Sequence, residues 1–254
     1  MPEFRIDLEE VPEKLPKAPI VEAVIHWRAR PAKEVEPTEL LTQLKEKLPD
    51  YPHSQGQHEV GLEAKVGPHE SAIQQRHVWH GFRFESVDRL QVAQFTRNGF
   101  VFSRLKPYED WEQFSTEGER LWRIYCELTE PAEVSRLGVR FINQITPIKP
   151  DSLDDLLELP PRSPEKLALP IAKFTHQDTF DIPGYPYKLN VIQTIQPANP
   201  PETSADSLIL DLDVYTAGAV QHDDLDEKLL HMHWIKNKAF FSFLTTTAIA
   251  RFRD

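Results

Sequence analysis

The same succession of patterns occurs twice in this chain. Residues 21–31 alternate apolar and polar like a strand, and a Pro/Glu-rich turn and the helical stretch 38–48 follow. Residues 137–147 are a second strand-like run, before a Pro/Asp-rich turn and the helical stretch 152–159. Each opening continues into several strand-like runs and one long amphipathic helix. Because copies of one unit fold alike, the repetition predicts architecture more firmly than chemistry.

The runs after each opening alternate with the period of a strand. They fall at 58–66, 76–86, 89–96 and 99–105 in the first half, and near 171–181, 186–196 and 207–216 in the second. Each series ends in a long helical pattern, 108–129 in the first half and 224–249 in the second. Asn98-Gly99 is a strong signal for a tight hairpin. Asp224 and Glu227 have the spacing of a helix capping box.

A helix that follows a meander of strands must cover one face of the sheet. We therefore predict an α+β fold of two duplicated strand–helix–meander–helix units. Their strands are expected to form one curved antiparallel sheet with the helices on one side. The units span residues 19–134 and 135–254 and pack as one globular body, and residues 1–18 form a charged, proline-punctuated arm. This topology resembles the duplicated fold of TATA-box-binding protein.

Composition argues against several classes of protein. The formal net charge is −11, from 29 Lys and Arg against 40 Asp and Glu, which disfavours non-specific nucleic-acid binding. No run approaches the roughly 18 apolar residues that a membrane span needs, and the N-terminus lacks a secretory pattern, so we expect a cytoplasmic protein without a membrane partner. The single cysteine, Cys126, excludes an intrachain disulfide.

The sequence contains no recognisable catalytic or metal-binding motif. His231 and His233 lie two apart on a predicted helix and so point in different directions. Asp211 and Asp213 share one strand face and could hold a cation, but alternation with buried Leu and Val residues accounts for them as a polar face. We expect no metal, no cofactor and no catalytic residue, and favour a protein that is not an enzyme.

Two arginines are the most informative charged residues. Arg136 and Arg140 are four apart and therefore on the same face of a predicted strand. In one interpretation Arg140 pairs with a carboxylate such as Glu22 on the matching strand and locks the two halves together. In the other, its guanidinium binds a carboxylate or phosphate of a ligand. We favour the first. Asn143 is expected on the opposite, core face with its amide hydrogen-bonded.

The tryptophans of the chain are spread over both halves at helical or isolated strand positions. We expect all five in the core rather than in a base-stacking platform, namely Trp27, Trp79, Trp111, Trp122 and Trp234.

Four stretches resemble a known family. They are Ala18-Pro-Ile-Val-Glu-Ala23, Gly81-Phe-Arg-Phe84, Tyr108-x-x-Trp111 and Arg136-Leu-Gly-Val-Arg-Phe-Ile-Asn143. The chain is similar to a sporadically distributed family of uncharacterised bacterial proteins of about this length. The resemblance implies a bacterial cytoplasmic protein whose gene is scattered among genomes, as mobile or defence-linked genes are. It carries no established catalytic residue.

Two functions from different classes fit the sequence. We favour a non-catalytic adaptor that docks another protein on its curved sheet or helix face, in a bacterial defence or stress module. The alternative is a small-molecule or anion-binding domain, enzymatic or not, with Arg140 as the anchor in a cavity between sheet and helices. A closed pocket lined by Arg140, Glu22 and a histidine would favour the alternative, and a filled core with an exposed apolar patch would favour the adaptor.

Overall fold

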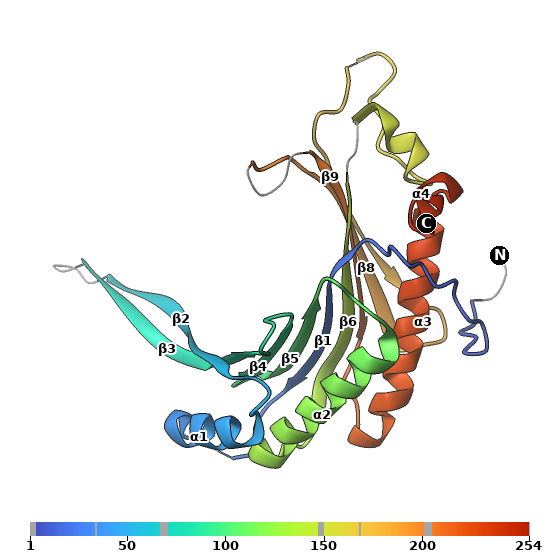
Figure 1. The fold of residues 1–254 in the computed structure, drawn as a ribbon. Helices are drawn as coiled ribbons and strands as arrows, with labels where there is room; N and C mark the ends of the chain where they lie inside the picture. Colours follow the sequence, from blue (N-terminus) through green and yellow to red (C-terminus); the bar gives the residue numbers. More distant parts are fainter. Residues whose placement is uncertain are drawn as a thin grey trace.

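A nine-stranded antiparallel sheet organises the chain. The computed structural model describes residues 4–33, 35–66, 71–146, 150–167, 169–200 and 205–253, with the backbone alone at 59–66, 71–77 and 150–152. The strands are β1 (Ile20–Ala29), β2 (His53–Val66), β3 (Ser71–Glu85), β4 (Gln91–Thr96), β5 (Gly99–Leu105), β6 (Val134–Ile145), β7 (Thr175–Asp181), β8 (Tyr187–Gln196) and β9 (Ser207–Thr216). They pair in the order β2-β3-β4-β5-β1-β6-β9-β8-β7 (Figure 1). The predicted α+β class and antiparallel sheet are confirmed.

The helices pack on one face of this sheet. They are α1 (Pro37–Lys47), α2 (Trp111–Thr129), α3 (Leu225–Phe243) and α4 (Thr246–Ala250), with the 3-10 turns η1 (Pro150–Asp155) and η2 (His222–Asp224). Helix α2 contacts β1 and β5, and α3 contacts β6, β8 and β9. In Figure 1 the sheet curves and α1, α2 and α3 all lie on its convex side. We call the opposite side the concave face.

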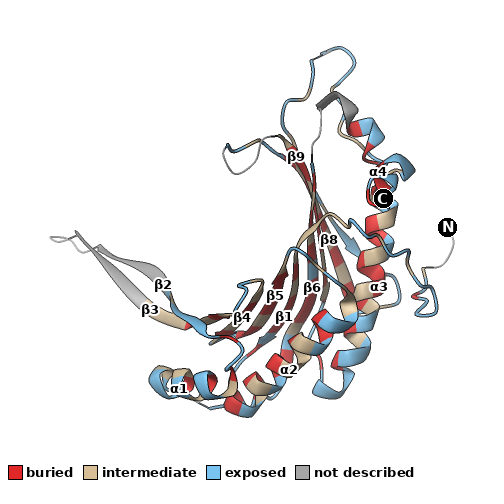
Figure 2. Ribbon diagram, viewed as in Figure 1, coloured by how far each residue is buried: buried red, intermediate tan, exposed pale blue. Residues whose placement is uncertain are grey.

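Strands β1 and β6 form the centre of the sheet. Ile25 pairs with Val139 and Trp27 with Leu137, and all four are buried toward the helices. Apolar residues at alternate positions thus line the convex side, as the period-two pattern predicts (Figure 2). On the outer side of β1 the strands follow in the order β5, β4, β3 and β2, and on the outer side of β6 in the order β9, β8 and β7. On both sides, strands farther from the centre thus come earlier in the sequence.

Local signals explain where the helices begin and end. The Asp110 carboxylate accepts a 2.9 Å hydrogen bond from the Gln113 N–H, so α2 begins at residue 111 and not at 108. The predicted helix 224–249 is divided, because Thr245 starts the separate short helix α4. The predicted capping box is wrong: the Asp224 side chain makes no capping hydrogen bond, and the 3-10 turn η2 leads into α3 instead.

The remaining boundaries differ most around the first hairpin and the second short helix. The predicted helix 152–159 is the 3-10 turn η1. Strands β2 and β3 begin earlier than the predicted runs at 58 and 76, and only Gly81–Glu85 of β3 pairs with β4. The hairpin therefore extends past the rest of the sheet (Figure 1). The Asn98-Gly99 hairpin is confirmed, with Gly99 at φ +137°.

The N-terminal arm packs against the second half of the chain. Ile6 is buried, and its N–H donates to the Tyr185 hydroxyl at 3.2 Å. Further along, Lys17 N–H donates to the Phe252 carbonyl at 3.0 Å. These contacts place the arm along α3 and the C-terminal residues. Within the part of the chain that the structure describes, no helix is long and apolar enough to cross a membrane.

Candidate functional site

The concave face is the side of the sheet that the described helices leave uncovered. Partners in an antiparallel register share a face, so one transverse row contains Val24 of β1, Arg140 of β6, Asp213 of β9 and Asn190 of β8. Arg136 belongs to the same face, two positions before Gly138 on β6. The predicted placement of both arginines on one strand face is confirmed.

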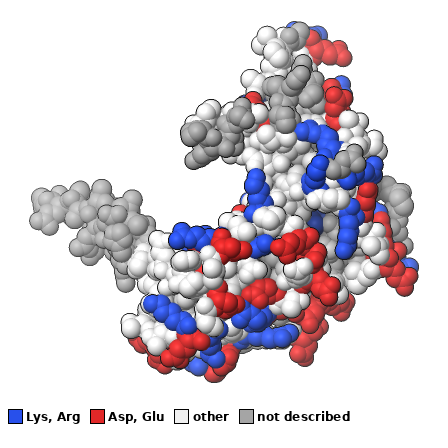
Figure 3. Space-filling model, viewed as in Figure 1, with Lys and Arg blue, Asp and Glu red and all other residues white. Residues whose placement is uncertain are grey.

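Charges on the concave face balance, although the whole chain carries −11. The register places on it the basic residues Arg28, Arg83, Arg136, Arg140 and Lys188 and the acidic residues Glu22, Glu85, Asp181, Asp211 and Asp213. Several of them pair with each other, including Arg83 with Glu85 at 3.0 Å and Lys188 with Asp181 at 2.6 Å. The excess negative charge therefore lies elsewhere, and Figure 3 shows acidic and basic side chains intermixed over the helices.

Arg140 forms a two-pronged ion pair with Asp211. Its Nε donates to Asp211 Oδ1 at 2.8 Å and its Nη2 to Oδ2 at 2.5 Å. This hydrogen bonding, more than any other contact, raises the pKa of Arg140. The Asp211 side chain is 8% exposed and the Arg140 side chain 46%. Asp211 thus fixes the guanidinium, while half of the Arg140 side chain remains open to the concave face.

The predicted pairing of Arg140 with Glu22 is wrong. Glu22 lies on β1 opposite Ile142, two residues before Val24, which is the β1 partner of Arg140. Among the described ion pairs, the partner of Arg140 is Asp211, which belongs to the same half of the chain. The pair therefore joins β6 to β9 and does not lock the two halves together. Glu22 is half-buried and makes no described ion pair.

Arg136 lies flat across the sheet. Its Nη2 donates to Asp213 Oδ2 at 2.8 Å, and its guanidinium carbon is 4.4 Å from the centre of the Tyr215 ring. Its Nη1 is 3.4 Å from His26 Nδ1, so this contact joins β6 to β1 across the two halves. Gly138 makes room for the side chain, because a Cβ there would lie 2.7 Å from Arg136 Nη1.

Burial controls protonation in this cluster. Desolvation, followed by the nearby Arg136 and Arg28, lowers the pKa of His26 to about 4, so the imidazole is neutral at pH 7 and Nδ1 accepts from Arg136. Burial also raises the pKa of Asp213, against the opposing effect of Arg136. The described hydrogen bonds of His26 include no hydroxyl or thiol nucleophile. The cluster thus holds side chains of β1, β6 and β9 together on the concave face.

Other predicted residues lie away from this cluster. Asn143 is confirmed in the core, where its Nδ2 donates to the Leu210 carbonyl at 3.0 Å. His231 contacts the Tyr187 hydroxyl, whereas His233 stacks on Trp111 at 4.2 Å between ring centres. Burial raises the pKa of Cys126 to about 12. Among the described residues, no group of three His, Cys, Asp or Glu side chains could hold a metal ion.

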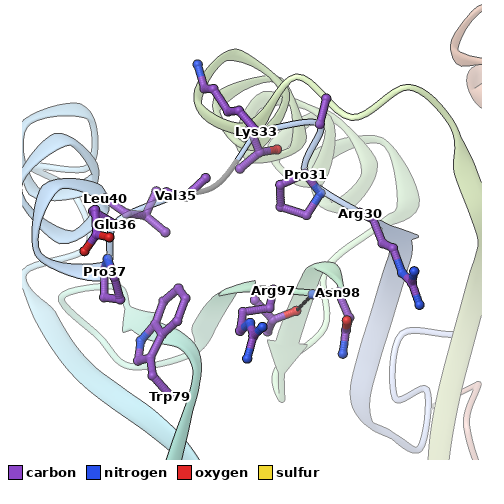
Figure 4. Close-up of a pocket in the computed structure, with 13 residues that line it drawn as sticks. Arg30, Pro31, Lys33, Val35, Glu36, Pro37, Leu40, Trp79, Arg97 and Asn98 are labelled. Carbon is purple, nitrogen blue, oxygen red and sulfur yellow. Dashed lines mark hydrogen bonds between the residues drawn. The ribbon is translucent and has the colours of Figure 1, made fainter.

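Sequence reasoning missed a pocket at the end of β1. It has a volume of about 630 Å³ and opens between the β1–α1 loop, β3 and the β4–β5 turn (Figure 4). We call it the Trp79 pocket, lined by Arg30, Pro31, Ala32, Lys33, Val35, Glu36, Pro37, Leu40, Trp79, Thr96, Arg97, Asn98 and Thr129. Trp79 was expected in the core and instead lines this opening, half-buried. Residues from five segments meet here, so no local pattern could identify the pocket.

Comparison with known proteins adds no assignment to this geometry. No family model matches the chain, and no curated protein matches it.

Proposed function

We propose that this protein is a non-catalytic adaptor that docks a protein partner on its concave face, within a bacterial defence or stress module of the cytoplasm. The observation that carries the proposal is the Arg140–Asp211 pair, at the centre of the sheet face that the described helices leave uncovered. Asp211 holds the guanidinium in place and uses two of its five N–H donors. The other donors are available to a partner at low entropic cost, because the side chain is already ordered.

The charge balance of the concave face supports a protein partner over a nucleic acid. Duplex DNA binding requires a surplus of Lys and Arg over the contact area, whereas the described basic and acidic side chains of this face are equal in number and largely paired. A partner surface of mixed charge meets such a face without strong repulsion. We therefore propose a partner segment that brings a carboxylate to Arg140 and a basic group to Glu22.

The alternative function places a small anion on Arg140 in a cavity between the sheet and the long helices. Against it, Arg140 points away from the helices, and the space between sheet and helices is filled by one cluster of buried side chains. The docking proposal needs no cavity at this position.

We also infer that residues 19–134 and 135–254 are copies of one unit. The backward strand order on both sides of the β1–β6 pair supports this inference. So do the matching contacts of α2 with β1 and β5 and of α3 with β6 and β9. Superposition of β1, β5 and α2 on β6, β9 and α3 tests it, and a fit no better than that of unrelated hairpin–helix units would contradict it.

Site-specific photocrosslinking in the native host tests the docking proposal. A benzophenone amino acid replaces Val24 on the concave face or, as a matched control, Arg123 on the exposed side of α2. We expect one protein to crosslink from position 24 and not from position 123, and the crosslink to disappear in Arg140→Glu. The double variant Arg140→Glu, Asp211→Arg restores an internal pair with reversed charges and separates loss of folding from loss of docking.

Three outcomes would contradict the proposal. One is a partner that crosslinks equally well from both positions. Another is a partner that still crosslinks in a folded Arg140→Glu protein. The third is tight, salt-sensitive binding of duplex DNA that Arg140→Glu abolishes, which would reassign the concave face to nucleic acid.

A further inference from the structure

The Trp79 pocket combines an apolar wall with a cationic edge. Val35, Pro37, Leu40 and Trp79 form the wall on one side in Figure 4, and Arg97 and Asn98 lie along the floor beside it. Arg30 completes the edge opposite the wall. A pocket of this composition favours a ligand that is flat and apolar at one end and anionic at the other.

Backbone hydrogen bonds hold the walls of the pocket in place. Ala32 N–H donates to the Thr129 carbonyl at 3.0 Å, which ties the β1–α1 loop to the end of α2. Ala29 N–H donates to the Asn98 carbonyl at 2.9 Å, which ties β1 to the β4–β5 turn. The Tyr125 hydroxyl lies 3.2 Å from the Ala29 carbonyl and 3.3 Å from the Thr96 carbonyl. The pocket is therefore formed before any ligand arrives, which lowers the cost of binding.

The cations of the pocket differ in whether they are already neutralised. Lys33 is paired with Glu130 at 2.9 Å and points away from the opening in Figure 4. Arg30 and Arg97 are exposed, and neither has an ion-pair partner among the described residues. Two unneutralised guanidinium groups that line one pocket attract an anion such as a phosphate, to which an arginine fork donates two hydrogen bonds.

The Trp79 ring forms the aromatic part of the wall. Trp79 packs on Phe82 at 5.3 Å between ring centres, and its Nε1 is buried. The wall therefore offers a stacked ligand the accessible part of the indole ring and not its N–H. Glu36, at the same end of the pocket, could accept from an amino group of the ligand.

We propose that the Trp79 pocket binds a mononucleotide, with the base along the Trp79 wall and the phosphate between Arg97 and Arg30. This site is separate from the proposed docking cluster around Arg140, and neither proposal depends on the other. The pocket volume of about 630 Å³ lies within the range of small-molecule sites.

Titration calorimetry of the full chain with AMP, GMP, CMP and UMP tests the proposal. We expect at least one of these nucleotides to bind with a dissociation constant near or below about 1 mM. Arg97→Ala and Arg30→Ala should each weaken the affinity for that nucleotide about tenfold or more. Arg123→Ala, an exposed arginine on α2, is the matched control and should leave binding unchanged. Adenosine and inorganic phosphate, the two parts of AMP, should each bind more weakly than the nucleotide.

Trp79→Phe provides a second, gentler test, because it keeps an aromatic ring on the wall but reduces the area on which a base can stack. This variant should bind the nucleotide more weakly and keep the melting temperature of the original protein. Absence of saturation by all four nucleotides at about 10 mM would overturn the proposal. So would nucleotide binding that Arg97→Ala leaves intact in a folded protein, or phosphate binding as tight as that of the nucleotide. Photocrosslinking at position 24 is a separate readout, so failure of this site does not count against the docking proposal.

Discussion

The two halves of the sheet use different side chains to build the same layers. In the first half the core is a stack of rings, with Trp27 parallel to Trp122 at 5.6 Å and Trp122 against Tyr125 at 5.3 Å. In the second half, β9 packs against α3 with aliphatic residues such as Leu212 and Val214, and buried rings such as Phe141 and Phe240 lie among other aliphatic side chains. The difference shows that this architecture requires apolar alternation and not a particular kind of core. It also predicts that stability is concentrated in few residues in one half and spread over many in the other.

The largest effect is expected from Trp27→Ala, which removes the centre of the ring stack. Trp27 is fully buried, so the free energy of unfolding should fall by about 3–5 kcal/mol in urea denaturation. Trp111→Ala is the control. Because Trp111 is only half-buried, its substitution should lower the free energy of unfolding clearly less than Trp27→Ala does. Equal losses in the two variants would show that stability is not concentrated in the ring stack.

A smaller loss is expected from Leu212→Ala in the second half. Leu212 is fully buried between its strand partners Phe141 and Val191, and the substitution should cost about 2–4 kcal/mol. Leu230→Ala, at an exposed position of α3, should change stability by less than about 0.5 kcal/mol. If Leu212→Ala cost more than Trp27→Ala, the proposed contrast between the halves would be reversed.

Lys236 of α3 is an amino group buried in the core of the second half. It is 6% exposed, its Nζ lies 3.9 Å from the centre of the Phe141 ring, and it donates to Asn237 Oδ1 at 2.6 Å. Burial lowers its pKa to about 7. The unfolded chain therefore binds more protons than the folded chain between about pH 7 and 10.5, and this lysine makes stability rise with pH across that window.

Lys236→Met should remove that rise and increase the free energy of unfolding at pH 7 by about 1–2 kcal/mol. Denaturation at pH 7 and pH 9.5 measures both effects. Lys238→Met is the control, since Lys238 is half-exposed and paired with Glu10. A pH slope that survives in Lys236→Met would assign the rise to other groups.

The smallest effect is expected on the concave face, which lies outside both cores. Arg140→Ala removes the partner of Asp211 and should cost about 1 kcal/mol, because loss of the half-exposed Arg140 side chain lets water reach the Asp211 carboxylate. Asp211→Ala leaves an arginine that water can solvate and should cost less. Thermal melts of both variants measure the difference, and the opposite order would mean that Asp211 has a second partner.

Local patterns predicted the strands and helices wherever apolar residues recur with the period of the element. They failed where a segment is a strand only because it is hydrogen-bonded to a neighbouring strand. The start of β2, His53-Ser-Gln-Gly-Gln57, has no apolar residue and is a strand because it pairs with β3. The partner of Arg140 could not be predicted, since Asp211 is 71 positions away and depends on β9 pairing with β6. Trp79 was misplaced for the same reason, as distant segments form its pocket.

The central β1–β6 pair has a consequence for how the chain is made. His26 and Arg136, which meet across this pair, are separated by 110 positions. At roughly 5–20 residues per second, a ribosome needs about 5–20 s to make that intervening segment. During that interval β1 can pair with β5 on one side only, and its other backbone edge remains without a partner. A nascent chain of this fold thus carries a reactive strand edge until β6 emerges, and slow translation beyond residue 134 would prolong its exposure to aggregation.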